Sequence, residues 1–224
     1  MKKKNFIPIA KDVIEAEIKS LKKLKLSIND SFNKAVEALI NCKNGKVIIS
    51  GVGKSGIIGK KISSTLASVG IQSFFVDAAA CSHGDLGQIG SNDVLILISF
   101  SGESAELKNI IQYAKRNKKI TLIGIVSKKN SILYKASDIK LFIPEVKEAG
   151  LEIVPTSSTC EQLAIGDCLA VASLNKKKFN KKNFKELHPS GALGAKLKTT
   201  EDIMISGNGI PFIYENSNMK KALN

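Results

Sequence analysis

Three segments of the chain combine glycine, hydroxyl and charged residues in a way that can bind an anion. Residues 51–56 read Gly-Val-Gly-Lys-Ser-Gly, residues 99–104 read Ser-Phe-Ser-Gly-Glu-Ser, and residues 156–159 read Thr-Ser-Ser-Thr. Each segment follows an apolar run typical of a strand or opens a pattern typical of a helix. Free backbone amides at helix starts and nearby hydroxyls bind phosphate oxygens. Together the three segments predict a site for a phosphorylated small molecule.

The glycine segment 51–56 has rival interpretations. It matches G-x-G-x-x-G between a strand and a helix, and Asp77 closes the following strand, which is the arrangement of a dinucleotide site. A Walker A loop does not fit, because Ile48 stands where that motif requires glycine. A tight turn with an exposed Lys54 is the structural alternative, and helix capping is the alternative for each hydroxyl segment alone. The pair of hydroxyl segments favours a phosphosugar, because a nucleotide fold does not require them.

Composition indicates one sizeable domain and a basic surface. The chain has 224 residues, 43% of them hydrophobic, and a formal net charge of +14. Its lysines gather at expected helix ends and connections, without the interleaved aromatic residues of nucleic-acid sites. No apolar run reaches the ~18 residues of a membrane span, and no export signal is recognisable. We therefore expect a cytoplasmic protein that binds neither nucleic acid nor membrane, with a modest attraction for anionic substrates.

Four cysteines, Cys42, Cys81, Cys160 and Cys168, form no CxxC pair and no disulfide-like spacing. With only two histidines in the chain, His83 and His188, the supply of metal ligands is small. We interpret the cysteines as small, reduced, buried hydrophobic residues.

Short β-branched runs alternate with amphipathic ones, which predicts a three-layer α/β/α sandwich around a five-stranded parallel sheet. We expect a helical stretch over 12–41, broken near 27–30 with Asn29 or Asp30 as a cap. The strands are expected at 46–50, 71–76, 93–99, 120–126 and 139–143. Further helices are expected at 56–68, 104–116, 132–136, 158–174 and 183–187. Residues 1–198 are assigned to this domain, and residues 199–224 to a tail or the start of another domain.

Six motifs in order resemble the sugar isomerase (SIS) domain and, within it, the arabinose-5-phosphate isomerase family. They lie at 51–56, 83–87 (His-Gly-Asp-Leu-Gly), 99–104, 155–159, 166–170 (Gly-Asp-Cys-Leu-Ala) and 188–194 (His-Pro-Ser-Gly-Ala-Leu-Gly). The resemblance implies the reversible conversion of D-ribulose 5-phosphate to D-arabinose 5-phosphate for Kdo and lipopolysaccharide biosynthesis, with no cofactor required. It also implies a homotetramer and a pair of CBS domains after the isomerase domain, so that 199–224 looks like the start of the first one.

The resemblance carries catalytic roles to Lys54, Glu106, Glu148 and His188. Aldose–ketose isomerisation moves a proton between C1 and C2 through an enediol, so it needs a base and an acid. We expect Glu148 or Glu106 to be the base, His188 to assist ring opening or protonate oxygen, and Lys54 to stabilise negative charge. His83 is expected to contact substrate or an inhibitory zinc ion. The residues predicted to bind substrate are Gly53, Ser55, Asp77, His83, Ser99, Ser101, Ser104, Thr156, Ser157, Ser158 and Thr159.

The chain departs from the family pattern at several positions. The family usually carries histidine and glutamate where this chain has Asp77 and Ala80. The segment after Glu148 lacks the usual Cys-Pro, and Ser190 replaces a common glycine. Asp77 would repel an anion unless it binds sugar hydroxyls. Two other functions are therefore weighed: a phosphosugar-binding regulator without activity, and an NAD-binding oxidoreductase that uses the glycine segment with Asp77.

Overall fold

Five apolar segments form one parallel sheet at the centre of the structure. The strands are β1 (Val47–Gly51), β2 (Ser73–Phe75), β3 (Val94–Ile98), β4 (Thr121–Val126) and β5 (Ile139–Phe142), and they lie in the order β2-β1-β3-β4-β5. All pairs are parallel. Every residue of β1 and β3 is buried, because helices cover both faces of the sheet. The predicted five-stranded sheet and three-layer architecture are confirmed.

This computed structural model describes residues 5–177, 183, 185, 187 and 200–222. The chain divides into two compact units, residues 1–180 and 181–224. The sheet belongs to the first unit.

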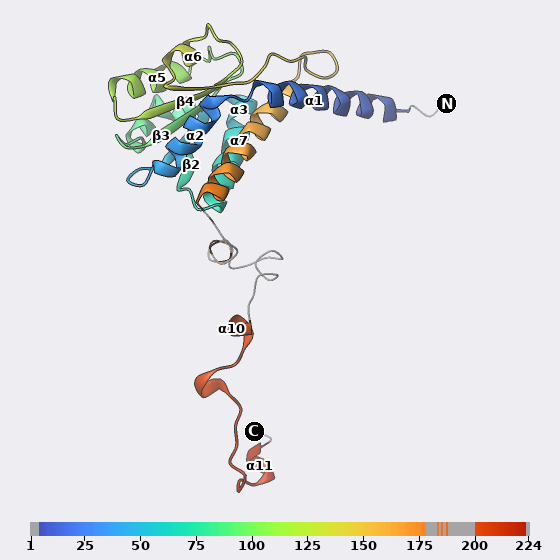
Figure 1. Ribbon diagram of the computed structural model, residues 1–224, viewed down its shortest axis with the longest axis vertical. Helices are drawn as coiled ribbons and strands as arrows, with labels where there is room; N and C mark the ends of the chain where they lie inside the picture. The colour runs from blue at the N-terminus through green and yellow to red at the C-terminus, as the bar shows by residue number, and fades with distance from the viewer. Residues whose placement is uncertain (1–4, 178–182, 184, 186, 188–199, 223–224) are drawn as a thin grey trace. The chain divides into compact units, whose positions relative to one another are not determined.

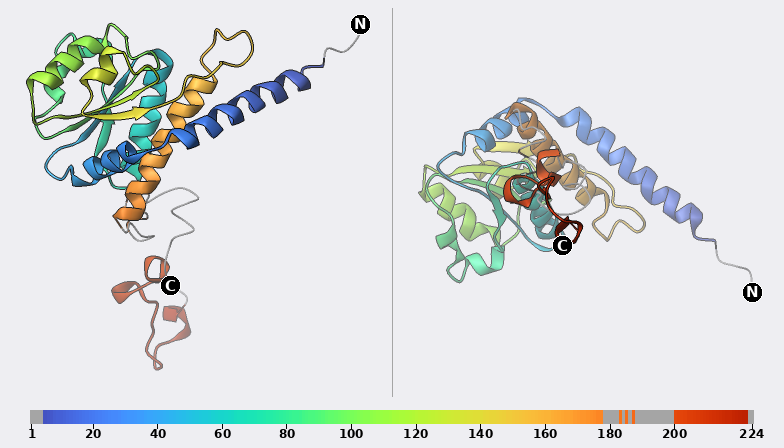
Figure 2. Two further views of the ribbon diagram at one scale, coloured as in Figure 1. Left: turned by 45° about the horizontal axis from the view of Figure 1, so that its top comes forward. Right: turned by 90° about the horizontal axis from the view of Figure 1, so that it is seen from below.

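Two sets of helices cover the two faces of the sheet (Figures 1 and 2). One face carries α1 (Ile7–Ser27), α2 (Asp30–Asn41), α3 (Gly53–Ser68) and α7 (Ser157–Lys176). The other face carries α4 (Ala78–Cys81), α5 (Leu107–Arg116) and α6 (Ile132–Ala136). The short 3₁₀ helix η1 (Asp85–Gln88) follows α4. Alternate residues of β1 point to opposite faces, so Ile49 joins the core under α3 and α7 while Ile48 joins the core under α5.

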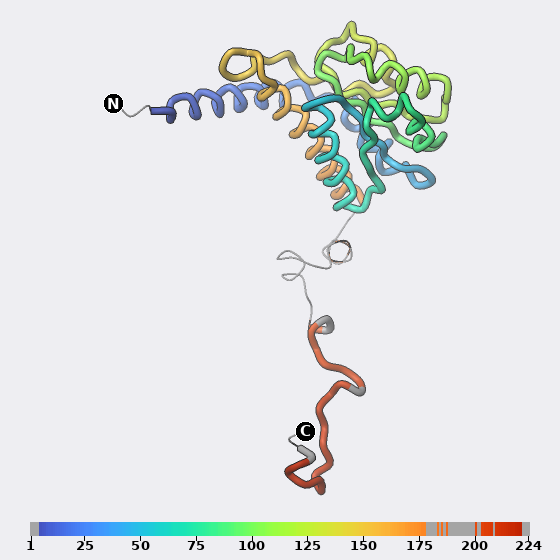
Figure 3. Tube along the Cα trace, turned by 180° about the vertical axis from the view of Figure 1, so that it is seen from behind, coloured from blue at the N-terminus to red at the C-terminus, as the bar shows by residue number. Residues whose placement is uncertain are grey.

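The predicted break in the N-terminal helical stretch is confirmed. Asn29 caps α2 by accepting a hydrogen bond from the backbone N–H of Ser31 at 2.9 Å. The helix before the break starts at Ile7 and not near Asp12 as expected, because Pro8 is compatible with a first helical turn. The N-terminal part of α1 extends beyond the sheet (Figure 3).

The four cysteines are free thiols with different environments. The expectation of burial is confirmed for Cys81, which is 1% exposed. It is wrong for Cys168, which is exposed because it shares the outer face of α7 with Val171. Cys42 and Cys160 are partly buried.

The order of the strands creates a switch point beside β1. The chain leaves β1 through α3 toward β2, and the next strand, β3, lies on the other side of β1. In open parallel sheets, ligands bind at the carboxyl ends of the strands where the order reverses. Segments 51–56 and 99–104 follow β1 and β3 and therefore lie at this point.

The second unit contains α10 (Thr200–Ile203), the 3₁₀ helix η2 (Gly207–Gly209) and α11 (Met219–Ala222). Phe212 and Tyr214 pack edge to face, with ring centroids 6.0 Å apart. Both side chains are more than 70% exposed. The predicted boundary at 198/199 stays a prediction, since residues 188–199 are outside the described ones, and so does the helix expected at 183–187. In the described part of the chain, no helix is long and apolar enough to cross a membrane.

Candidate functional site

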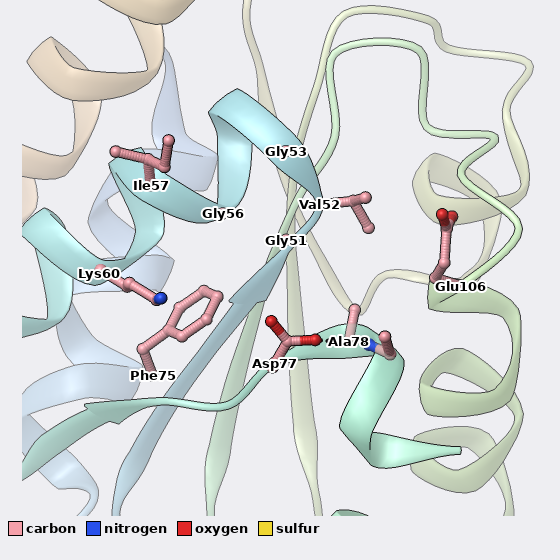
Figure 4. Close-up of a pocket in the computed structure, with 11 residues that line it drawn as sticks. Gly51, Val52, Gly53, Gly56, Ile57, Lys60, Phe75, Asp77, Ala78 and Glu106 are labelled. Atoms are coloured by element: carbon pink, nitrogen blue, oxygen red, sulfur yellow. Dashed lines mark hydrogen bonds between the residues drawn. The ribbon is translucent and has the colours of Figure 1, made fainter. Parts of the chain in front are cut away.

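A pocket of about 270 Å³ lies at the carboxyl end of β1 (Figure 4). It is enclosed by the glycine turn, the first two turns of α3, the end of β2, the start of α4 and the residue before α5. Its lining residues are Gly51, Val52, Gly53, Gly56, Ile57, Lys60, Phe75, Asp77, Ala78, Ala79 and Glu106. The pocket lies at the switch point between β1 and β3, where the topology favours a ligand.

The glycines of segment 51–56 bring the backbone close to this pocket. Gly53 opens α3 with φ +58°, a conformation that favours glycine. A Cβ on Gly56 would stand 2.7 Å from the carbonyl oxygen of Gly51, so the turn closes only with glycine at this position. The free N–H groups of the first turn of α3 and its dipole favour an anion beside the turn. The expected anion-binding turn is therefore present at the mouth of the pocket.

Two carboxylates from different elements line the same pocket. Asp77 caps α4, and its Oδ1 accepts hydrogen bonds from the backbone N–H of Ala79 at 2.8 Å and of Ala80 at 3.4 Å. Glu106 precedes α5, is exposed, and makes no side-chain capping bond to that helix. In Figure 4, Glu106 stands on the opposite side of the glycine turn from Phe75. The pocket thus offers one anchored and one uncommitted carboxylate to a ligand.

Lys60 is a lining residue that the sequence analysis missed. Its ammonium lies 5.3 Å from the centroid of the Phe75 ring, a cation–π arrangement at the side of the pocket. Among the described lining residues, Lys60 is the only one with a positively charged side chain. The sequence could have placed Lys60 at the site, because Gly53, Gly56 and Lys60 follow the i, i+3, i+7 spacing of one helix face.

Three predicted site residues on α3 and after α4 do not line the pocket. Lys54 lies in the first turn of α3 but is exposed, and Ser55 is partly buried beside it. His83 is exposed in the turn after α4, where its backbone N–H donates to the carbonyl of Ala80 at 2.9 Å. Among the described residues, no three His, Cys, Asp or Glu side chains could together hold a metal ion. The zinc contact of His83 stays a prediction.

The first hydroxyl segment bonds mainly to itself. The hydroxyls of Ser99 and Ser104 lie 3.0 Å apart, and Ser99 Oγ accepts from the N–H of Gly102 at 3.0 Å. Ser101 Oγ accepts from the N–H of Glu103 at 3.2 Å. These bonds shape the loop between β3 and α5, so the hydroxyls are held at the carboxyl end of the sheet. They are not lining residues of the pocket at β1.

Glu148 organises the second hydroxyl segment. Its Oε2 accepts hydrogen bonds from the N–H of Thr156 at 2.7 Å, from Thr156 Oγ1 at 3.1 Å and from the N–H of Ser158 at 3.2 Å. Thr156 Oγ1 in turn accepts from the N–H of Ala149 at 2.9 Å. Burial opposes ionisation of Glu148, but the hydrogen bonds from Ser158 and Thr156 outweigh it and lower the pKa of the carboxyl.

This environment differs from the one expected of a catalytic base, whose pKa is raised toward neutrality. Glu148 is instead an ionised carboxylate bound to the amides that open α7. Thr159 donates its hydroxyl to the carbonyl of Thr156 at 2.7 Å, while Ser157 and Ser158 are buried. The predicted residues Glu148 and 156–159 therefore form one unit, separate from the lining of the pocket at β1. His188 lies outside the described residues.

Comparison with known proteins defines the class of protein. Residues 39–172 match the family model of the SIS domain. The chain belongs to the SIS domain family.

Two curated relatives make the similarity more specific. The chain is 44% identical to arabinose 5-phosphate isomerase KdsD of Francisella tularensis over 218 residues, which covers 96% of this chain and 66% of that protein. It is 42% identical to KdsD of Escherichia coli K12 over 221 residues, which covers 98% of this chain and 67% of that protein. The chain thus spans about two thirds of the length of these relatives.

Among solved structures, c3406 of E. coli CFT073 in complex with arabinose 5-phosphate has a TM-score of 0.79 and 36% sequence identity. The similarity covers 84% of this chain and 100% of that chain.

Proposed function

We propose that this chain is an aldose–ketose isomerase that interconverts D-ribulose 5-phosphate and D-arabinose 5-phosphate. The observation that carries the proposal is the pocket at the switch point beside β1, with a glycine turn, two carboxylates and a lysine, in a chain 44% identical to a KdsD isomerase. The similarity of the fold to c3406 in complex with arabinose 5-phosphate supports the same substrate. We propose that no cofactor is required, since the reaction only moves a proton between adjacent carbons.

Glu106 is assigned as the base. It lines the pocket and makes no capping bond, whereas the carboxylate of Glu148 is engaged by three donors. Glu106 takes the proton from the carbon next to the carbonyl of the opened sugar and returns it to the neighbouring carbon of the enediol. His188 is assigned to sugar-ring opening and to proton transfer at the oxygens.

Positive groups stabilise the negative charge that develops on the enediol oxygens. The amides of the glycine turn and Lys54 are assigned to this charge, since both belong to the start of α3. Asp77 is assigned to a sugar hydroxyl, because its Oδ1 is used for capping while the side chain still lines the pocket. The serine segment 99–104 and the threonine–serine segment 156–159 lie outside the lining of the pocket, at the end of β3 and the start of α7, and are assigned to the phosphate at the far end of the sugar.

We further propose that the chain works in the cytoplasm as a homotetramer that supplies arabinose 5-phosphate for Kdo and lipopolysaccharide biosynthesis. A stripe of exposed apolar residues along α1 supports self-association: Ile7 is 63% exposed, Ile14 56% and Ile18 39%. Residues 199–224 are assigned to the start of a CBS domain. Light scattering coupled to size-exclusion chromatography measures the oligomeric state, and a monomer would refute the tetramer.

The activity is tested by incubating the metal-free protein with ribulose 5-phosphate and no cofactor, and by measuring arabinose 5-phosphate over time. Glu106→Gln is expected to lose at least ~100-fold in kcat, the usual contribution of a general base. Glu37→Gln, an exposed change on α2 with the same loss of charge, is the matched control. Binding without turnover in the wild type would indicate a regulator, and a requirement for NAD would indicate an oxidoreductase.

A further inference from the structure

A second carboxylate is buried in α7 and has no part in the reaction proposed above. Glu161 is 0% exposed. Both of its side-chain oxygens lack a hydrogen-bond partner among the described residues. A buried ionised carboxylate without hydrogen-bond donors is very unfavourable. The group therefore stays protonated unless an opposite charge or a donor offsets the loss of water.

Glu161 lies next to the hydrogen bonds that Glu148 makes. Ser158, whose N–H donates to Glu148, precedes Glu161 by three residues and therefore lies beside it on α7. Burial and, to a smaller extent, the nearby carboxylate of Glu148 together raise the pKa of Glu161 to about 8, against the opposing effect of Lys23. At neutral pH, one of the two carboxyl groups is charged and the other is neutral.

The charged groups that act on Glu161 come from two other parts of the chain. Glu148 belongs to the segment before α7, and Lys23 comes from α1. Glu17, also on α1, acts on the adjacent thiol of Cys160 in α7. These contacts leave Glu161 without a bonded cation among the described residues, so its neutral form avoids a second negative charge beside Glu148.

We propose that Glu161 is a positioning residue whose neutral form keeps Glu148 bound to the amides of Thr156 and Ser158. The proposal rests on the proposed function, in which segment 156–159 holds the substrate phosphate. Loss of the proton from Glu161 to solvent adds a buried negative charge that repels the partly buried carboxylate of Glu148. Their repulsion pushes Glu148 away from α7 and releases the segment that it shapes.

The consequence is a loss of phosphosugar affinity at alkaline pH. The substrate does not cause it, because a phosphate monoester with a second pKa of ~6 is already a dianion above pH 8.

The test compares the wild type with Glu161→Gln, which keeps the shape of the side chain but cannot ionise. Calorimetric titration with arabinose 5-phosphate at pH 7.5 and pH 9.5 gives the affinity ratio between the two pH values. We expect the wild-type affinity to fall by more than ~10-fold, because a group with a pKa of about 8 is mostly protonated at pH 7.5 and almost fully ionised at pH 9.5. In Glu161→Gln the ratio stays close to one. Glu145→Gln, an exposed change three residues before Glu148, should behave as the wild type. Superimposable pH profiles for the wild type and Glu161→Gln would overturn the proposal.

A second measurement does not depend on the substrate. Amide hydrogen exchange, corrected for the intrinsic effect of pH, reports the protection of the N–H groups of Thr156 and Ser158. Their protection should fall above pH 8 in the wild type and in Glu145→Gln, but not in Glu161→Gln. If arabinose 5-phosphate does not bind at pH 7.5 while this difference is seen, the proposed function fails and the positioning role of Glu161 stands. Equal protection in all three proteins would refute the positioning role whatever the substrate is.

Discussion

Three glutamates near the carboxyl end of the sheet have three different environments. Glu106 is exposed and lines the pocket, Glu148 accepts hydrogen bonds from the start of α7, and Glu161 is buried without a donor among the described residues. The side chain is the same in each case, so solvent exposure and donors decide which one is charged. This division explains why the base is assigned to Glu106 and not to Glu148.

Glu148→Gln should lower both activity and stability. Because hydrogen bonds lower the pKa of Glu148 in the folded protein, its carboxylate stabilises the fold above the unfolded pKa, and this contribution is lost as pH falls through the folded pKa. We expect the variant to lose most activity and ~1.5–3 kcal/mol of unfolding free energy at pH 7, the usual contribution of bonds to a charged group. Chemical denaturation at several pH values measures the difference, which should shrink below pH ~4.5.

The control for this change is Glu152→Gln. Glu152 lies four residues after Glu148 and forms an exposed ion pair with Lys147 at 3.2 Å. Such a pair contributes less than ~1 kcal/mol. A difference between Glu148→Gln and the wild type that does not depend on pH would contradict the assigned ionisation.

Lys60→Met should weaken substrate binding. Lys60 is the cation among the described lining residues of a pocket that also contains Asp77 and Glu106, so its loss makes the pocket more negative. Because Lys60 is exposed, we expect a moderate rise in KM for ribulose 5-phosphate, about three- to tenfold, for a loss of ~1 kcal/mol. Steady-state kinetics separate KM from kcat.

Lys46→Met is the matched control for Lys60→Met. The ammonium of Lys46 lies 5.7 Å from the centroid of the Phe74 ring, so it has the same chemistry, but it precedes β1 at the end away from the pocket. Its KM should equal that of the wild type. An equal effect of both changes would mean that overall charge, and not the pocket, determines the KM.

At the scale of elements, close packing of α3 on α7 holds the glycine turn and segment 156–159 on one frame. Gly166 of α7 faces Ile62 of α3, and a Cβ at this position would collide with the Ile62 side chain. Ile62 is itself 0% exposed and has little room to move. The small residue therefore sets the distance between the two helices.

Gly166→Ala should destabilise the fold. Overpacking costs about 1–3 kcal/mol, which exceeds the ~1 kcal/mol that alanine gains over glycine in a helix. Gly87→Ala is the control, since no atom lies within 4 Å of a Cβ built there. Urea denaturation measures both, and a Gly166→Ala protein as stable as the wild type would mean that the helices separate without cost.

At the scale of the whole molecule, the net charge of +14 favours the approach of an anionic substrate. Salt screens this attraction, because the Debye length falls from ~10 Å at 0.1 M to ~3 Å at 1 M. We therefore expect kcat/KM for ribulose 5-phosphate to fall several-fold over this range of sodium chloride, mainly through KM. A melting temperature measured in the same buffers controls for stability. A KM independent of salt would show that only local charges act on the substrate.

The sequence predicted the main elements well where patterns were local. The run Val94–Ile98 is apolar throughout and forms a buried strand, and Asn29 is both a preferred cap residue and the observed cap. The four-residue helix α4 was missed, because Ala78–Cys81 is too short to show a helical period. Lys60 was missed because a lysine on a helix is normally read as solvent-exposed surface.

The amino-acid sequence by itself determined the alternation of strands and helices, the glycine turn and the motifs of the family, because these depend on residues close together in the chain. Only the tertiary structure decided which carboxylate is free, which is capped and which is buried. Glu148 is bound by donors eight to ten residues away, and Glu161 is buried where α1 and α7 pack together. The protonation state of a carboxyl group depends on its distance in space from donors and charges and on the exclusion of water. The order of the residues shows neither.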